Sequence, residues 1–220
     1  MKSEIMDVMI LAGSIIGIFA LSEILYHFLK VRTEYTRKFV HISTGIVTLL
    51  FPVMLGSHWL VLMLCFSFGV LLIISLRLNF LPSVNAIKRK SVGSIAYPVA
   101  VYGSYLIYEY FNQNIYYYLP ILILAVCDPI AALTGKRWPL GQYKAGEEYK
   151  TIMGSSMFCF SAIIVTITVF SVLNFELNYI YLFTIAIVAA IAEGLSQKGF
   201  DNITIPLSVI CSMIIIDYLF

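Results

Sequence analysis

The sequence predicts an all-α integral membrane protein with about eight transmembrane helices in one bundle. Of its 220 residues, 60% are hydrophobic and only 12% are charged, whereas a soluble domain has roughly 45–50% apolar and about 25% charged residues. The apolar residues form continuous runs, not the alternating pattern of a membrane β-barrel. The basic residues gather between alternate runs. These observations exclude a soluble globular domain, a disordered chain and a small disulfide-linked fold.

Eight apolar runs are candidates for the helices, since a hydrocarbon core of about 30 Å needs roughly 20 apolar residues per span. The second run is short, and the first follows acidic residues instead of a basic cluster, so we expect a retained span and not a cleaved signal. We expect a single transmembrane domain over residues 1–220. The runs cover about 6–29, 39–55, 58–76, 92–110, 115–134, 153–173, 179–197 and 203–220.

The distribution of Lys and Arg predicts the orientation. If the N-terminus is outside, the cytoplasmic loops lie near 30–38, 77–91, 135–152 and 198–202, and they hold 13 of the 14 basic residues. Only Lys2 lies on the opposite side. Because cytoplasmic loops carry an excess of Lys and Arg, both termini are predicted outside.

Ionisable residues inside spans are costly and indicate function. His41, Asp128 and Glu193 lie near the predicted cytoplasmic ends of their spans. Glu23 and His27, four residues apart, lie at the same level and are interpreted as an interfacial pair. The polar groups therefore cluster at one face of the membrane.

Segment 128–156 has the composition of a polyphosphate site. It combines a carboxylate, four cations, four glycines and hydroxyl groups at a helix start. Lysines neutralise phosphate charge, and the unpaired N–H groups of a helix start bind phosphate oxygens. A carboxylate can hold Mg²⁺ together with substrate phosphates. Gly141 to Gly146 matches part of a P-loop, but Glu147 and Glu148 follow, which excludes that motif. The alternative is an ordinary basic loop with turn glycines.

Two further clusters are predicted on the same side. Arg37 and His41 share one helix face because they are four residues apart. Glu193, Asp201 and Asn202 surround the turn before the last span. The net charge of +2 gives no argument for a nucleic-acid partner.

Together these motifs resemble the CTP-dependent polyprenol kinases, the group of dolichol kinase and phytol kinase, which are related to phosphatidate cytidylyltransferases. The resemblance covers about 37–206. It departs from the family pattern at Cys127, where glycine is usual, and in the long 142–149 segment. Its motifs are Arg37-Lys38-x-x-His41-x-x-x-Gly45, Ser91-Val-Gly93 through Tyr97-Pro98, Asp128 with Gly135, Lys150-Thr151, Gly154-Ser155, Glu193-Gly-Leu-Ser, and Gly199-Phe-Asp201-Asn202 through Pro206.

The resemblance implies transfer of a phosphoryl group from cytosolic CTP to the hydroxyl of an isoprenoid alcohol in the bilayer, with Mg²⁺ as cofactor. Asp128, His41 and Glu193 are the implied catalytic residues, and Asp128 and Asp201 the metal ligands. The roles of metal ligand and general base are not separable by sequence. The implied nucleotide or phosphate ligands are Arg37, Lys136, Lys144, Lys150, Thr151, Gly154, Ser155 and Asn202.

Three other functions remain open. A phosphatidate cytidylyltransferase would use the same nucleotide, but its denser His and Asp signature is absent. A CTP-dependent diacylglycerol kinase would differ only in the acceptor, which the sequence does not identify. A small proton-coupled transporter would need polar residues near the bilayer midplane and repeated halves. The sequence does not identify the chain length of the lipid or the oligomeric state of the protein.

Overall fold

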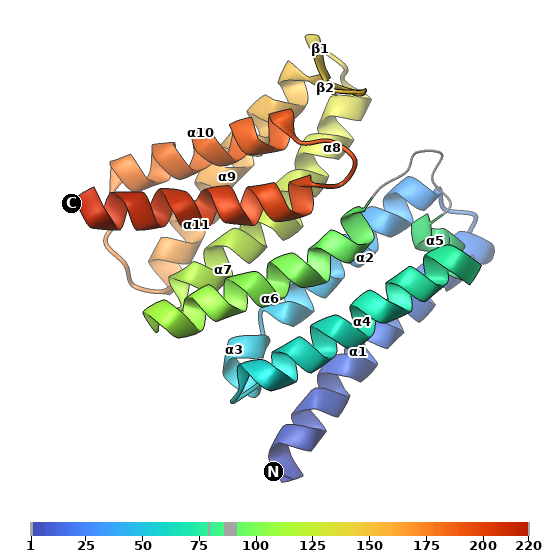
Figure 1. Cartoon of the computed structure of the whole chain (residues 1–220). Helices are drawn as coiled ribbons and strands as arrows, with labels where there is room; N and C mark the ends of the chain where they lie inside the picture. Colours follow the sequence, from blue (N-terminus) through green and yellow to red (C-terminus); the bar gives the residue numbers. More distant parts are fainter. Residues whose placement is uncertain (1, 79, 86–91, 220) are drawn as a thin grey trace.

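A computed structural model describes residues 2–78, 80–85 and 92–219, with the side chains of residues 2 and 3 left out. The chain folds into a bundle of helices with one small β-hairpin at one end (Figure 1). We call this end the hairpin end. It also carries the start of α2 (Thr33–Thr48), helix α5 (Pro82–Asn85) and the turn between α10 (Tyr179–Leu195) and α11 (Asp201–Leu219), while both chain termini lie away from it (Figure 1).

Most elements follow the predicted runs, but the run 39–55 is divided between two helices that meet near residues 49–50. The elements are α1 (Lys2–His27), α2 (Thr33–Thr48), α3 (Phe51–Met54), α4 (His58–Leu78), α5 (Pro82–Asn85), α6 (Gly93–Phe111), α7 (Ile115–Leu122), the π-helix η1 (Ile123–Cys127), α8 (Asp128–Arg137), β1 (Gln142–Ala145), β2 (Glu148–Thr151), α9 (Ile152–Val172), α10 (Tyr179–Leu195) and α11 (Asp201–Leu219).

The helices confirm an all-α membrane protein. Among the described residues, five helical segments are long and apolar enough to cross a membrane, and α10 is a shorter apolar helix. Large apolar side chains are exposed along α1, α4 and α10, as expected for surfaces that face lipid. The number of eight spans and the outside position of both termini stay predictions. The five segments are Glu4–His27, His58–Leu78, Ile115–Arg137, Ile152–Val172 and Asp201–Leu219.

Two segments that the sequence predicts as loops contain regular secondary structure. The loop near 30–38 is mostly helical, since α2 begins at Thr33. Its first turns are polar, so hydropathy could not find them. The loop near 135–152 contains the antiparallel pair β1–β2. Gly146 has φ +59° in the two-residue turn between the strands, a backbone conformation that favours glycine. Lys88, Arg89 and Lys90, which the orientation argument counted, lie outside the described residues.

The segment Ile115–Arg137 lies at the centre of the bundle. It runs continuously through α7, η1 and α8, and 61% of its most apolar 18-residue window is buried. One core packs it against α9, α10 and α11, and two smaller cores connect α1, α2, α4 and α6. The central segment therefore positions Asp128 between the two halves of the molecule.

Pro129, which follows the π-helix closely, leaves one carbonyl of that helix without a backbone donor. In a π-turn, a carbonyl pairs with the N–H five residues further on. For Leu124 that residue is Pro129, which has no N–H. The carbonyl of Leu124 is therefore available to a partner outside the helix.

Candidate active site

A cavity of about 790 Å³ runs from the hairpin end into the bundle. At the hairpin end its walls are polar, with groups from α2, α8, β2, α10 and α11. Deeper in the bundle its walls are apolar side chains of α1, α2, α4 and α6, among them Phe19, Val40, Leu72, Leu64 and Val101. One cavity therefore joins a charged compartment to an apolar one.

Asp128 and Lys38 form a buried ion pair where the two compartments meet. Lys38 Nζ lies 2.6 Å from Asp128 Oδ2, and the two side chains are 10% and 6% exposed. A buried charge is stable only when it is paired. The pair joins α2 to the start of α8, and both residues line the cavity.

His41 lies one turn after Lys38 on α2, and its ring is held by the backbone carbonyl of Leu124. Its Nε2 is 3.0 Å from the carbonyl oxygen of Leu124 and 3.9 Å from Asp128 Oδ2. Because a carbonyl only accepts, Nε2 carries the proton. The ring also meets the ring of Tyr97 edge to face, with 4.7 Å between centroids.

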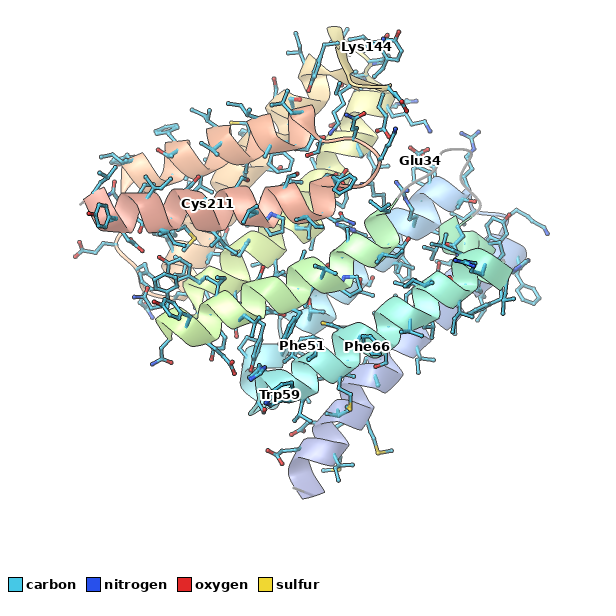
Figure 2. The ribbon with its side chains drawn as sticks, in the orientation of Figure 1. Glu34, Phe51, Trp59, Phe66, Lys144 and Cys211 are labelled. Carbon is cyan, nitrogen blue, oxygen red and sulfur yellow. The ribbon has the colours of Figure 1, made fainter. Side chains whose placement is uncertain are left out.

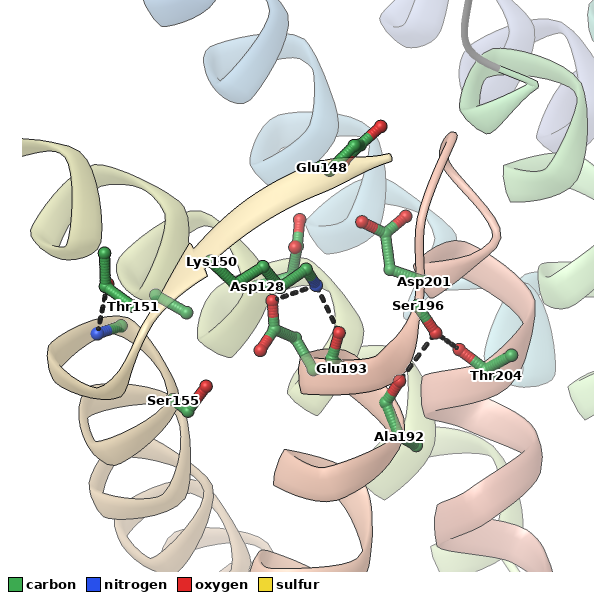
Figure 3. A network of polar contacts seen from close by, with 12 residues as sticks. Asp128, Glu148, Lys150, Thr151, Ser155, Ala192, Glu193, Ser196, Asp201 and Thr204 are labelled. Carbon is green, nitrogen blue, oxygen red and sulfur yellow. Dashed lines mark hydrogen bonds and ion pairs between the residues drawn. The ribbon is translucent and has the colours of Figure 1, made fainter. Parts of the chain in front are cut away.

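Lys150 and Glu193 form a second partly buried pair. Lys150 Nζ donates to Glu193 Oε1 at 2.6 Å and also to the backbone carbonyl of Glu193 (Figure 3). The two side chains are 14% and 9% exposed. The contact fastens strand β2 to the end of α10, and it brings Lys150 close to Asp128.

Asp201 and Asn202 enter the cavity from the start of α11. The amide Nδ2 of buried Asn202 donates to the carbonyl of Gly93 at 2.7 Å, which ties α11 to the start of α6. Asp201 Oδ1 accepts from the backbone N–H of Asn202 at 2.9 Å. Figure 3 shows Asp128, Lys150, Glu193 and Asp201 converging from four different elements.

The glycines of the predicted phosphate segment have a packing role here. A Cβ on Gly135 would lie 2.5 Å from Thr151 Oγ1 and 3.3 Å from the Cα of Gly154. Helices α8 and α9 therefore cross closely at this pair of glycines. Thr151 caps α9 by accepting from the Gly154 N–H at 3.0 Å, so that N–H already has a partner.

The hairpin is held over the site by side-chain contacts. The hydroxyl groups of Tyr143 and Ser155 lie 2.7 Å apart and join β1 to α9. Beside the turn, Lys198 Nζ lies 2.8 Å from Glu147 Oε2. This pairing lowers the pKa of the exposed Glu147 carboxyl. The backbone N–H of Lys198 donates to Glu148 at 3.0 Å.

The structure brings most of the predicted site residues to one cavity, but not all. Lys144 is exposed on the hairpin and does not line the cavity (Figure 2). Lys136 lines its outer edge and pairs with Glu34. The predicted residues that do line the cavity are Arg37, His41, Asp128, Lys136, Lys150, Thr151, Gly154, Ser155, Glu193, Asp201 and Asn202.

Sequence reasoning gave no site role to Lys38, Tyr97 or Tyr143, although Lys38 and Tyr97 stand in motifs that carry the resemblance. Lys38 was counted as a cation that sets orientation and was quoted in the motif from Arg37 to Gly45 without a role of its own. Its position three residues before His41 on the same helix is the signal that could have found it. Tyr97 was quoted in its motif without a role, and nothing in the local sequence distinguishes Tyr143 from the other aromatic residues.

The carboxylates do not form a complete metal cage by themselves. Within the described ranges, no group of three His, Cys, Asp or Glu side chains is placed to hold a metal ion. Asp128 and Asp201 nevertheless share the cavity. Mg²⁺ is commonly held by one or two carboxylates plus the phosphates of a substrate, and Asp128 and Asp201 are the described residues that would supply such carboxylates here.

An apolar, largely helical bundle with such a charged cavity is the architecture of an integral membrane enzyme acting where membrane and water meet. The chain is 32% identical over 180 residues to a phytol kinase of Synechocystis sp. (strain ATCC 27184 / PCC 6803 / Kazusa), covering 79% of this chain and 76% of the relative. The chain belongs to the polyprenol and phytol kinase family. No family model matches it, and no solved structure matches it.

Proposed function

We propose that this protein transfers the γ-phosphoryl group of CTP to the hydroxyl of a membrane-embedded isoprenoid alcohol. The observation that carries the proposal is the single cavity, polar at the hairpin end and apolar inside the bundle. A water-soluble triphosphate and a lipid alcohol can meet only in such a place. The kinship with a phytol kinase supports an isoprenoid acceptor.

The cations of the cavity would hold the nucleotide. Arg37, Lys136 and Lys150 lie at its polar end, where they would neutralise the triphosphate, and phosphoryl transfer depends mainly on such charge neutralisation and positioning. Lys150 is held in place by Glu193. The choice of CTP over another nucleotide rests on the resemblance of the sequence motifs.

Mg²⁺ is the proposed cofactor, as the sequence resemblance implies. Asp128 and Asp201 would be its protein ligands, and phosphate oxygens would complete the set. When bound, the ion would neutralise charge on the transferring phosphate.

The lipid hydroxyl would lie beside Asp128. Its oxygen forms a bond to the γ-phosphorus while the bond from that phosphorus to the β–γ bridging oxygen breaks, so that CDP leaves. Asp128 accepts the hydroxyl proton, and Lys38 orients the carboxylate. His41 donates through Nε2 to Leu124, which favours a positioning role over the alternative role of base.

The reaction is proposed for the cytoplasmic side. Support comes from the charge distribution, since all but one Lys or Arg fall in the four loops predicted inside. The described parts of these loops lie at the hairpin end (Figure 1), and the cavity opens there. A nucleotide from the cytosol would reach it directly.

The proposal is tested with purified protein and radiolabelled nucleotides. CTP, ATP, GTP and UTP are each supplied with Mg²⁺ and with phytol, geranylgeraniol, a polyprenol, diacylglycerol or phosphatidate. We expect a prenyl phosphate and CDP from CTP. A CDP-lipid made from phosphatidate would indicate a cytidylyltransferase, and phosphatidate made from diacylglycerol would indicate a diacylglycerol kinase. The absence of any nucleotide turnover would favour the transporter. Each of these outcomes contradicts the proposal.

A further inference from the structure

Residues 196–200 connect α10 to α11, and we call this segment the connecting turn. It comes directly before Asp201 and Asn202, which line the cavity from the start of α11. Gln197 and Lys198 do not line the cavity, and the proposed transfer gives them no role. Their contacts nevertheless join the turn to the hairpin and to α6.

The connecting turn is joined to the tip of the hairpin. Gln197 Oε1 accepts a hydrogen bond from the backbone N–H of Glu147 at 3.2 Å. A Cβ on Gly146 would overlap the side-chain amide of Gln197, so the glycine at the tip permits this close approach. The backbone N–H of Lys198 donates to Glu148 Oε1 at 3.0 Å. Strand β2 is therefore fixed against the turn at its first residue.

The connecting turn is also joined to the start of α6. The carbonyl of Lys198 accepts from the backbone N–H of Val92 at 2.9 Å, and the side chain of Asn202 donates to the carbonyl of Gly93. Lys198 has φ +55°, a left-handed conformation that is uncommon for a residue with a side chain. Such a conformation persists only where the surrounding contacts determine it. Here these contacts are made by the N–H and the carbonyl of Lys198, each to a different element.

The two ends of the connecting turn are held together. The hydroxyl of buried Ser196 contacts that of Thr204, which fastens the end of α10 to α11 (Figure 3). The carbonyl of Gln197 accepts from the backbone N–H of Phe200 at 3.0 Å. The path from the hairpin contact at Gln197 to the carboxylate of Asp201 is therefore short and closed by hydrogen bonds.

The connecting turn lies between two groups that the proposed reaction must align. Lys150 on β2 would bind the phosphates of the nucleotide, and Asp201 would supply a carboxylate beside them. A misplacement of about 1 Å, even one caused far from the chemistry, can cost about 10²-fold in rate. A firm connection between the hairpin and the start of α11 would keep the distance between these two groups constant.

Resting on the proposed kinase activity, we propose that Gln197 is a positioning residue, which acts through the connecting turn to hold Asp201 in place relative to the nucleotide-binding strand. Gln197 touches no substrate. A nucleotide that orders the hairpin also orders the turn, because the two are joined. Loosening this connection lowers the rate of phosphoryl transfer more than it weakens nucleotide binding.

The test replaces Gln197 by two side chains of similar length. Gln197→Met removes the hydrogen-bond acceptor, and Gln197→Glu keeps one. With phytol as acceptor and the full chain in lipid nanodiscs, Gln197→Met should lower kcat about tenfold and change KM for CTP by at most about twofold. Gln197→Glu should retain most of the kcat. Gln113→Met, the same change at an exposed glutamine outside the cavity, should alter neither constant.

Amide hydrogen exchange gives a readout that needs no turnover. CTP with Mg²⁺ should slow exchange of the wild-type protein both in the hairpin, residues 142–151, and in residues 196–202. In Gln197→Met, the slowing should remain in the hairpin and be lost in residues 196–202. If Gln197→Met does not fold, the wild-type experiment decides alone.

Two results would overturn the positioning proposal while the kinase proposal stands. One is slowed exchange in the wild-type hairpin without any change in residues 196–202, and the other is an unchanged kcat in Gln197→Met. Slowed exchange in both segments, without phosphorylation of any alcohol, would instead overturn the kinase proposal and support the connection between hairpin and turn. No change of exchange with CTP in either segment would overturn the positioning proposal as well.

Discussion

Lys38 on α2 holds Asp128 at the start of α8 through a 2.6 Å contact between two side chains that are at most a tenth exposed. The contact joins residues 90 positions apart in the sequence. It places one carboxylate at the boundary between the charged and the apolar parts of a cavity.

Asp128→Asn should abolish most of the kinase activity. The amide keeps the size of the side chain but cannot take a proton or bind a metal well, and loss of a general base typically costs about 10²–10⁴-fold. Turnover of labelled CTP measures it. Asp217→Asn is the control, because Asp217 accepts a hydrogen bond from Tyr116 away from the cavity. Near wild-type turnover of Asp128→Asn would contradict the assigned role.

Lys38→Met should destabilise the fold as well as the site. It leaves the carboxylate of Asp128 buried and unpaired, which costs about 3–5 kcal/mol, and a thermal unfolding curve in detergent will show a clear loss. The double variant Lys38→Met/Asp128→Asn should recover part of the lost stability, since it leaves neither member of the pair charged and without its partner. The exposed pair of Lys136 and Glu34 gives the comparison: Lys136→Met should cost at most about 1 kcal/mol. Equal losses from the two single variants would argue against a buried ion pair.

Lys150→Met should raise KM for the nucleotide more than it lowers kcat. Lys150 is held by Glu193 at the polar end of the cavity, where the charge of Lys150 would contribute to nucleotide binding. Glu193→Gln should cause a smaller effect of the same kind, because an amide still accepts a hydrogen bond. Initial rates over a range of CTP concentrations separate the two constants. Lys30→Met, which removes an exposed cation outside the cavity, should change neither, and a KM unaffected by Lys150→Met would remove this residue from the nucleotide site.

Gly135→Ala should displace the hairpin. The added methyl group would lie 2.5 Å from Thr151 Oγ1 and 3.3 Å from the Cα of Gly154. The Thr151 side chain, which caps α9, must therefore move, and the backbones of α8 and α9 must shift apart by a few tenths of an ångström. We expect a fall in melting temperature and at least tenfold lower activity. Gly103→Ala in α6 is the matched control, because nothing lies within 4 Å of its added Cβ, and alanine favours a helix by about 1 kcal/mol. Equal behaviour of the two variants would contradict the close crossing.

Hydropathy located the helices well because a membrane span is a long, strong signal. It failed at Thr33–Lys38, since the first turns of α2 are polar and carry no apolar run. The residue types of the site were also predictable, because ionisable groups such as His41, Asp128 and Glu193 are rare in spans.

The pairing within the site was not predictable from one sequence. Lys38 shows no role of its own until α2 is packed against α8. Gly135 and Gly154 fit a phosphate loop by composition, yet their contacts are those of a helix crossing. Lys144 belongs to the same basic segment as Lys150, but the alternation of a β-strand turns neighbouring positions to opposite faces. Only tertiary structure distinguishes these cases.

The central segment Ile115–Arg137 has a consequence for how variants of this protein are interpreted. It is the scaffold on which both halves of the bundle are assembled, and it also carries Asp128. Substitutions here will tend to impair assembly and chemistry together, whereas the outward sides of α1 and α4 should accept many apolar replacements. A complete mutational scan should therefore show this segment as the least tolerant span, and loss of activity there is informative only alongside a measurement of folding.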